Sequence, residues 1–400
     1  MRLSLLCTLP LLLSAPVLAQ DNVSAADRLL HEQMLVLDTH LDTPSFFERP
    51  GWNFDEHHHY DFDGSQVDIP RMEEAGLDGG FFVIYTPQGP LTPEGFAAAR
   101  NAALMRAVAI QRVVAANPDK LAFATTAADA ERLHREGKRI VYQSIENSYP
   151  LGTDLSLLDL FHRLGVRMAG PAHNGSNQFS DSNRVRPGDP VHNGLSPLGR
   201  AWVAEMNRLG MVIDGSHASD AAIEQMIQLS KTPIILSHHG PEAVFEHPRN
   251  ISDALMRRLA RSGGVMQMNT LFLRPTTTVA ARDAIEERQK KWEVMSPAER
   301  RQLIADRTAV EANAPDSRAS LDLFMKATLH AIEVMGVDHV GMGADWDGGG
   351  GLSNMPDISN LAAITARLRA AGLSDADIAK IWSGNTLWLL RQAEAFAAKK

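Results

Sequence analysis

The chain has 400 residues, of which 44% are hydrophobic and 22% are charged. This composition can supply a large buried core and excludes a disordered chain. The formal net charge of -9 argues against a nucleic-acid groove and against a general attraction to anionic membranes, so we expect no nucleic-acid partner.

The first 19 residues predict an export signal. Arg2 supplies a positive charge, a short apolar segment follows it, and small residues surround a cleavage site after Ala19. Pro10 and Pro16 interrupt the apolar segment, which is too short to span a membrane. We therefore expect residues 1–19 to be a signal peptide that is removed, with a retained anchor as the alternative.

Cleavage would leave residues 20–400 as a single domain, exported to the periplasm or secreted. The tail "RQAEAFAAKK" has no apolar segment, so we expect no stable membrane anchor after cleavage. The only cysteine, Cys7, lies in the signal. Any metal held by the mature chain must therefore be bound by nitrogen and oxygen ligands.

Short apolar runs alternate with helical patterns along the rest of the chain. The predicted strands are 34–40, 79–85, 139–146, 166–173, 210–217, 233–238, 263–269 and 339–345. The predicted helices are 94–116, 127–136, 196–208, 219–230, 252–262 and 319–335. Eight units of strand followed by helix predict an α/β fold of the (β/α)8 TIM-barrel type. An open, doubly wound sheet is the alternative that the strand count allows.

Residues 271–318 interrupt this alternation of strands and helices after the seventh predicted strand. The segment is charged and helix-prone, and Ser296, Pro297 and Glu299 predict the start of a helix. We predict a helical insertion that leaves from the carboxyl end of the strands. Two interpretations remain open: a lid or oligomer contact at the barrel mouth, and a solvated helical decoration.

Polar side chains gather at the predicted strand ends. The last residues of seven strands are His40, Glu146, His173, His217, His238, Asn269 and Asp345, and Asp42 lies two residues beyond the first of them. In a parallel barrel these ends meet at one mouth, where active sites of this architecture are built. A lone histidine in such a place is more often a core residue. The set as a whole predicts a site.

The residue types predict a centre with two metal ions. His40 and Asp42 lie at i and i+2 in extended backbone, so both face one side and can bind one cation. His217 and His238, from neighbouring strands, can bind another. A carboxylate that bridges the two ions is needed to hold them close, and Glu146 at the end of the third predicted strand is the natural candidate. Two such cations can activate a bridging hydroxide and polarise a carbonyl, which is hydrolase chemistry.

Seven motifs carry a resemblance to a known family. In chain order they are "DTHLDTP", "SIEN", "PAHNGSNQFSDS", "DGSHAS", "ILSHHGPEAV", "HPRNISDALMRRL" and "MGADWDG". Together they resemble the membrane dipeptidase (renal dipeptidase) family of zinc peptidases, from the superfamily of amidohydrolase-like barrels. The resemblance runs from about residue 31 to 392.

The resemblance implies a zinc-dependent dipeptidase, a hydrolase that cleaves the peptide bond of small dipeptides. It implies two Zn2+ per chain: His40 and Asp42 bind one ion, His217 and His238 bind the other, and Glu146 bridges both. A hydroxide held between the two ions would attack the substrate. The family also implies that a D-residue is accepted at the C-terminal position. The sequence leaves the oligomeric state open, a homodimer included.

The resemblance further implies two catalytic residues, Asp345 for proton transfer and His173 for polarising the substrate, and both would also contact the substrate. It implies that Arg249 binds the substrate carboxylate. A guanidinium suits this task because it can donate to both carboxylate oxygens. A surface arginine beside a helix start is the alternative for Arg249.

Two residues depart from the family's sequence pattern, and several others have structural rather than functional interpretations. Asn147 and Ser148 follow the bridging glutamate where the family usually has glycines, which puts the substrate size in doubt. We expect Asp347 to be structural and residues 57–59, all histidines, to lie in a surface or rim loop. His239 is the alternative to His238 as a metal ligand.

Two other functions stay open. One is a different hydrolysis at a binuclear site of this superfamily, of a lactone, a β-lactam or another amide. Those enzymes commonly begin with His-x-His, whereas the first strand here gives His-x-Asp. The other is a non-catalytic exported binding protein built on a decayed barrel, although all the expected ligand positions are intact.

Overall fold

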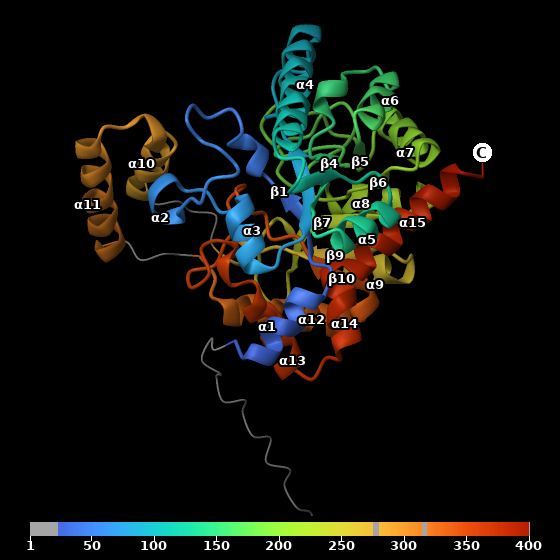
Figure 1. Ribbon diagram of the computed structural model, residues 1–400. Helices are drawn as coiled ribbons and strands as arrows, with labels where there is room; N and C mark the ends of the chain where they lie inside the picture. Colours follow the sequence, from blue (N-terminus) through green and yellow to red (C-terminus); the bar gives the residue numbers. More distant parts are fainter. Residues whose placement is uncertain (1–22, 275–279, 314–317, 400) are drawn as a thin grey trace, which may run out of the picture.

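The structure is a computed structural model that describes residues 23–274, 280–313 and 318–399 (Figure 1). The predicted signal peptide, residues 1–19, lies outside the described residues. No helix in the described part of the chain is long and apolar enough to cross a membrane.

The centre of the fold, in the described residues, is a closed ring of eight parallel strands. One sheet contains, in order, β1 (Leu37–Leu41), β2 (Gly79–Ile84), β4 (Arg139–Ile145), β5 (Val166–Ala169) and β6 (Val212–Ile213). The other contains β7 (Ile235–Pro241), β9 (Val265–Met268) and β10 (Val340–Met342). Parallel bridges from Asp214 to Ile235 and from Leu41 to Trp346 join the two sheets at both edges. The predicted (β/α)8 barrel is confirmed, and the open sheet is excluded.

Several strands are shorter than the sequence predicted. β5 ends at Ala169 and β6 ends at Ile213, so His173 and His217 lie in loops and not at strand ends. Pro171 has no N–H with which to continue a ladder, and His217 has a φ of +66°, which no strand contains. Two strands were missed because they are very short: β3 (Leu121–Phe123) beside β4, and β8 (Asn250–Ile251) beside β7.

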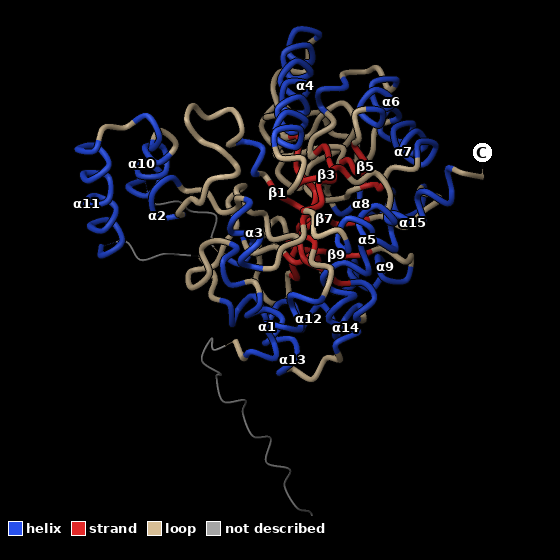
Figure 2. The backbone as a smooth tube through the Cα atoms, in the orientation of Figure 1, coloured by secondary structure: helices blue, strands red, loops and turns tan. Residues whose placement is uncertain are grey.

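Helices surround the strands, as Figure 2 shows. The six predicted helices are present as α4 (Pro93–Ala116), α5 (Ala127–Arg135), α7 (Pro197–Leu209), α8 (Asp220–Leu229), α9 (Asp253–Arg261) and α12 (Leu321–Met335). The other helices of the main body are α1 (Ala25–Gln33), α3 (Ile69–Ala75), α6 (Ser156–Arg163), α13 (Ala362–Ala370), α14 (Asp375–Ala379) and α15 (Asn385–Ala397). Ser219 and Ser252 cap α8 and α9, because their side chains accept from backbone N–H groups of the first turn.

The insertion after the seventh barrel strand is helical, as predicted. Its helices, α10 (Ala280–Gln289) and α11 (Pro297–Asn313), project from the barrel together with the short α2 (Tyr60–Asp63) (Figure 1). Ser296 and Glu299 exchange hydrogen bonds at the start of α11, which is the expected capping box. Phe62 stacks on Trp292 with ring centroids 5.1 Å apart. The insertion therefore rests on α2.

The loop with three consecutive histidines is only partly a surface loop. His57 and His59 are exposed, as expected, but His58 is buried. Its ring stacks on Trp52 at 4.6 Å, and its Nδ1 lies 2.7 Å from Asp63. Sequence alone could not separate the three, because only one of them faces the aromatic residues below the loop.

A buried histidine fixes α1 against the barrel. Nε2 of His31 donates to the carbonyl of Ala75 at 3.0 Å, and Nδ1 accepts from the hydroxyl of Thr365 at 2.7 Å. Trp382 in turn donates to that hydroxyl at 2.8 Å. The neutral ring is thus fully satisfied, and burial lowers the pKa of His31 to about 4.

This contact predicts a pH-dependent stability. The contacts of the neutral ring contribute fully to the free energy of unfolding above pH 6.5, the pKa of histidine in the unfolded chain. This contribution is lost as the pH falls toward about 4, the pKa of His31 in the folded protein. Between about pH 7 and pH 5 the free energy of unfolding should therefore fall by roughly 1–2 kcal/mol more in the wild type than in His31→Phe. Urea denaturation at both pH values measures the difference, with exposed His59→Gln as the control. Equal losses in wild type and His31→Phe would contradict the assignment.

Candidate metal centre

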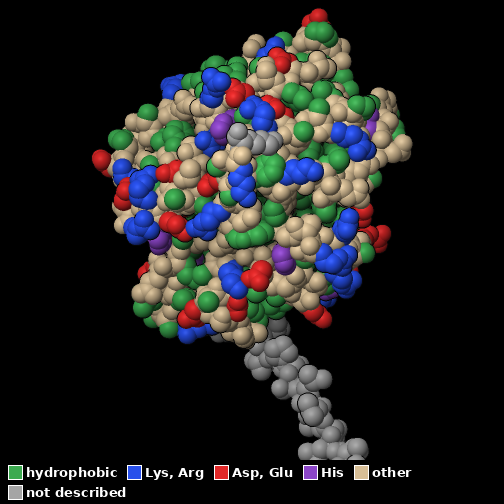
Figure 3. All heavy atoms as spheres, turned by 90° about the vertical axis from the view of Figure 1, so that its right-hand side faces the viewer, with side chains coloured by type: hydrophobic (Ala, Val, Ile, Leu, Met, Phe, Trp, Pro, Cys, Tyr) green, Lys and Arg blue, Asp and Glu red, His purple; other side chains and the backbone are tan. Residues whose placement is uncertain are grey.

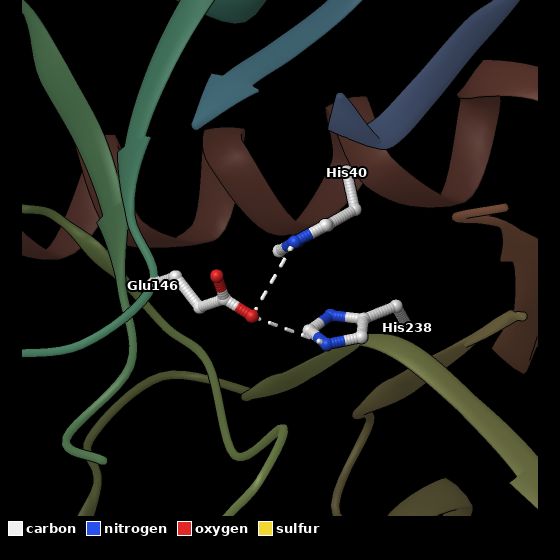
Figure 4. Close-up of side chains that lie close together, drawn as sticks. All are labelled: His40, Glu146 and His238. Carbon is white, nitrogen blue, oxygen red and sulfur yellow. Dashed lines mark ion pairs between the residues drawn. The ribbon is translucent and has the colours of Figure 1, made fainter. Parts of the chain in front are cut away.

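One carboxylate oxygen lies among four imidazoles at the barrel mouth. Oε1 of Glu146 is 3.0 Å from Nε2 of His217 and 3.5 Å from Nε2 of His40. The same atom is 3.6 Å from Nε2 of both His238 and His173. Figure 4 shows His40 and His238, from two strands, and Glu146, from the loop after β4, pointing toward one another. The structure thus brings together residues that are far apart in the sequence.

Two more carboxylates complete this cluster on one side. Nε2 of His40 lies 3.4 Å from Oδ2 of Asp42 and 3.9 Å from Oδ1 of Asp345. Asn269 donates to the other oxygen of Asp345 at 3.4 Å. All eight polar residues that the strand-end pattern singled out therefore lie in or beside what we call the Glu146 cluster.

Local backbone geometry directs these side chains toward one point. His40 lies within β1 and Glu146 directly follows β4. His238 lies in the middle of β7, so the prediction that it ends a strand is wrong. His217 and Asp345 each have a φ of +66°, a left-handed conformation that costs non-glycine residues about 1–3 kcal/mol. Such strain persists where surrounding contacts enforce it, and it is typical of functional sites.

A chain of hydrogen bonds orients His238. The hydroxyl of Ser237 donates to Oδ2 of Asp214 at 2.6 Å and so accepts from Nδ1 of His238 at 2.9 Å. The proton of His238 is therefore assigned to Nδ1, which leaves the lone pair of Nε2 facing Glu146. Sequence analysis missed Asp214 and Ser237, although both lie in the motifs that contain the ligands.

Asp38 plays a similar supporting part on the opposite side. It accepts from the backbone N–H of His40 at 2.8 Å and of Ala344 at 3.0 Å, which ties β1 to the segment after β10. Burial raises the pKa of Asp38 to about 7. Asp38, His40 and Asp42 alternate in "DTHLD". His40 and Asp42 face the Glu146 cluster, whereas Asp38 joins two parts of the barrel.

The Glu146 cluster concentrates negative charge in a buried place. Burial raises the pKa of Glu146 well above its usual value, and the charges of Asp42 and Asp345 add to this effect. Burial likewise raises the pKa of Asp345 to about 6. Burial opposes a charge on His40, but Glu146 and Asp42 outweigh it and raise the pKa of His40 to about 10. A cation bound among these carboxylates would therefore stabilise their charged forms.

These features fit divalent metal ions. Both ring nitrogens of His40 are buried and have no hydrogen-bond partner among the described residues. The ligand atoms form overlapping groups, each within 4.8 Å: His40, Glu146 and His238; Glu146, His173 and His217; His40, Asp42 and Asp345. Imidazoles and carboxylates without thiolates form a donor set that suits zinc. The residues present thus fit a metal centre.

His173 and Arg249 adjoin the Glu146 cluster. Burial and then the charge of Arg249 lower the pKa of His173 to about 3, so its ring is neutral. Arg249 is only 1% exposed, and its guanidinium lies over Phe272 at 4.3 Å. Its Nε donates to Nδ1 of His217 at 3.1 Å, whereas Nη1 has no partner among the described residues. The surface interpretation of this arginine is wrong.

Three residues near the mouth support loops. Asn147 accepts from the N–H of Tyr149 at 3.1 Å, and Ser148 donates to the carbonyl of Gly170 at 2.7 Å. The two residues that replace the family's glycines therefore hold their loop in place, and Ser148 ties it to the segment after β5. Asp347 accepts from Thr43 and from the N–H of Gln66, each at 2.6 Å, in keeping with a structural part.

Gly348, in the glycine-rich turn that follows Asp347, borders the Glu146 cluster. A Cβ at this position would lie well under 3.0 Å from carboxylate oxygens of both Asp42 and Asp345. The absence of a side chain here allows the backbone to approach the two carboxylates closely.

Comparison with known proteins decides the family. The sequence model described as "Membrane dipeptidase (Peptidase family M19)" matches residues 24–400. The chain belongs to this family. The resemblance in the seven motifs is thereby confirmed, and the protein is a hydrolase of the metallo-dipeptidase type.

Individual relatives and solved structures support this family assignment. The probable dipeptidase PvdM from Pseudomonas aeruginosa is 31% identical with a TM-score of 0.79, and the match covers 93% of this chain and 98% of that one. A metallo peptidase from Rhodobacter sphaeroides, liganded with a phosphinate mimic of the dipeptide L-Ala-D-Ala, is 25% identical with a TM-score of 0.70, covering 90% and 99%. Dipeptidase tcpJ of Claviceps purpurea is 29% identical over 340 residues, which is 84% of this chain and 71% of that one.

The close approach at Gly348 can be tested. In Gly348→Ala the new methyl group should push the carboxylates of Asp42 and Asp345 apart and weaken zinc binding by about tenfold or more. The fold should survive, because Gly348 is exposed and the atoms in its way are the ends of flexible side chains. Competition with a chromogenic chelator measures the affinity. Gly384→Ala is the control, since its Cβ meets nothing closer than 3.5 Å. Unchanged zinc affinity in Gly348→Ala would contradict the predicted contact.

Proposed function

We propose that the protein hydrolyses the single peptide bond of small dipeptides that carry a free C-terminal carboxylate, with two Zn2+ per chain. The observation that carries this proposal is the buried guanidinium of Arg249 beside the Glu146 cluster, with Nη1 unpaired among the described residues. A buried N–H without an acceptor is costly, and a substrate carboxylate would supply one.

The Glu146 cluster would hold both ions. His40 and Asp42 would bind one, His217 and His238 the other, and Glu146 both. When bound, the two ions supply an activated water for attack and polarise the scissile carbonyl. Two observations support this assignment. His40 and His217 approach Oε1 of Glu146 at 3.5 Å and 3.0 Å, and Nε2 of His238 lies 2.8 Å from Nε2 of His217.

Two residues would move or stabilise charge during hydrolysis. The neutral ring of His173 would donate a hydrogen bond to the scissile carbonyl oxygen as negative charge develops there, an effect typically worth roughly 3–4 kcal/mol. Asp345 would accept a proton from the attacking water, donate it to the leaving amine, and face the free amino group of the substrate. The position of Asp345 supports this role, since its Oδ1 lies 3.9 Å from His40.

Arg249 would select for length and tolerate either chirality at the C-terminal residue. Because it binds the terminal carboxylate next to the metal ligands, only one peptide bond can lie between that carboxylate and the amino group near Asp345. The Rhodobacter sphaeroides relative, solved with a mimic of L-Ala-D-Ala, supports acceptance of a D-residue at the C-terminal position.

A small substrate panel tests this proposal. The zinc-loaded protein should cleave L-Ala-L-Ala and L-Ala-D-Ala, and chelation should abolish cleavage of both. The matching C-terminal amides should be cleaved at least about a hundredfold more slowly in kcat/KM, because a neutral amide cannot pair with a guanidinium. Equal cleavage of acids and amides would overturn the carboxylate contact. Cleavage of neither acid by the zinc-loaded protein would point to another amide or lactone as the substrate.

Two variants separate binding from chemistry. Arg249→Ala should raise KM for the free-acid dipeptides by roughly tenfold or more and change kcat less. Asp345→Asn should mainly lower kcat, by about a hundredfold or more, because the amide cannot carry the proton. Steady-state kinetics with zinc content determined for each variant measures both. The reverse pattern would contradict the two roles.

We further propose that the protein is exported after cleavage behind Ala19. The charge on Arg2 and the short apolar segment support this proposal. Intact-mass analysis of protein recovered outside the cytoplasm should give a chain that begins at Gln20. A chain that keeps residues 1–19 and stays with the cytoplasm would contradict export.

A further inference from the structure

The loop between β5 and α7 places an arginine, Arg184, beside the Glu146 cluster. The residues just before it are fixed to the backbone of two histidines of that cluster. The N–H of Asn183 donates to the carbonyl of His217 at 2.9 Å, and the hydroxyl of Ser182 donates to the carbonyl of His173 at 2.6 Å. The N–H of Arg184 donates to the same hydroxyl at 3.1 Å. Arg184 therefore leaves the loop at the barrel mouth.

The half-buried side chain of Arg184 has no ion-pair partner among the described residues. The two acidic residues of its own loop, Asp181 and Asp189, are held by backbone N–H groups at 2.7–2.9 Å. On the face of the molecule in Figure 3, by contrast, basic and acidic side chains are interspersed. The charge of Arg184 is thus not paired within the described part of the chain.

His247 offers a hydrogen-bond donor near Arg184. Burial lowers the pKa of His247 to about 4, and the charges of Arg184 and Arg249 add to this effect, so both guanidinium groups lie near a neutral ring. Nδ1 of His247 accepts from the backbone N–H of Arg249 at 3.1 Å. The proton of the neutral ring is therefore on Nε2. This N–H has no hydrogen-bond partner among the described residues.

Phe272 fixes the neighbouring side chains. The ring of His247 stacks on it with centroids 5.1 Å apart, and the guanidinium of Arg249 lies over its other contacts at 4.3 Å from the centroid. Glu146 and Asp345 oppose the lowering of the pKa of Arg249 by burial, but neither forms an ion pair with it. Groups ordered in advance lose little entropy when a ligand binds.

These donors exceed what one carboxylate needs. In the proposed function the guanidinium of Arg249 binds the terminal carboxylate of the substrate, and it can donate to both oxygens. The guanidinium of Arg184 and the Nε2–H of His247 would then still lack acceptors. A second carboxylate on the same substrate residue would supply them, because that residue lies next to Arg249.

We propose that the preferred substrates are dipeptides whose C-terminal residue is aspartate or glutamate, and that Arg184 binds the side-chain carboxylate together with the Nε2–H of His247. This inference rests on the proposed dipeptidase function. Arg184 would determine specificity and take no part in the hydrolysis. Hydrogen bonds between a guanidinium and a carboxylate are stronger than those between neutral groups, so the charge of the side chain should decide the preference.

Steady-state kinetics of the zinc-loaded protein with L-Ala-Glu and L-Ala-Gln tests this preference, with an L- and a D-residue at the C-terminus in turn. The two substrates differ in charge and hardly in size. In at least one chirality the wild type should cleave the glutamate dipeptide about tenfold better or more in kcat/KM. Arg184→Ala should bring this ratio within about twofold of one, mainly by raising KM for L-Ala-Glu. Arg184→Glu should reverse it.

The glutamine dipeptide and L-Ala-Ala serve as internal controls. Their cleavage should stay within about twofold in Arg184→Ala, since neither side chain carries a charge. Arg186→Ala is the matched control variant. It removes an exposed arginine of the same loop, whose charge acts on His173 and not on His247, and it should keep the preference for glutamate. An equal loss of preference in Arg186→Ala would overturn a specific contact with Arg184.

The remaining outcomes separate this inference from the proposed function. Cleavage of L-Ala-Ala without a preference for glutamate over glutamine, or a preference that survives Arg184→Ala, would overturn the inference alone. Cleavage of no dipeptide would overturn the proposed function. Isothermal titration with free glutamate and glutamine decides the contact without turnover: glutamate should bind about tenfold tighter or more, and Arg184→Ala should abolish the difference. Equal binding of the two amino acids to the wild type would overturn the contact.

Discussion

The burial of one carboxylate, Glu146, is the constraint on which the rest of the site depends. A charged carboxylate inside a barrel is tolerated only when positive charge and hydrogen-bond donors surround it. Glu146 meets ligands from both sheets, because His40 comes from β1 and His238 from β7. The bridges that close the barrel at Asp214 and Leu41 lie beside these residues. The closed barrel therefore brings the ligands of the Glu146 cluster together.

Around this centre each supporting residue has one task. Asp38 ties β1 to the segment after β10, and Asp214 orients His238 through Ser237. Arg249 adds a buried positive charge at the edge of the cluster, beside His217. Gly348 lets the last loop approach the carboxylates.

The sequence predicted the barrel and the clustered residues because both depend on short-range patterns. Apolar runs mark buried strands, and the residues that follow them share one end of a parallel barrel. It did not predict the left-handed backbone of His217 or the burial of His58, since both depend on tertiary contacts. The hydrogen bond between Asp214 and Ser237 joins two strands and leaves no local signal.

The measurement that tests the central claim most directly is the metal content of the purified protein and of Glu146→Gln, determined by inductively coupled plasma mass spectrometry after dialysis against metal-free buffer. The account predicts two zinc ions per chain in the wild type. It predicts one or fewer in the variant, because a neutral amide cannot bridge two cations. The exposed pair that joins Arg132 to Glu136 supplies a control in Glu136→Gln, which should keep both ions. Fewer than one zinc ion in the wild type, or two retained in Glu146→Gln, would contradict the claim that this carboxylate organises the site.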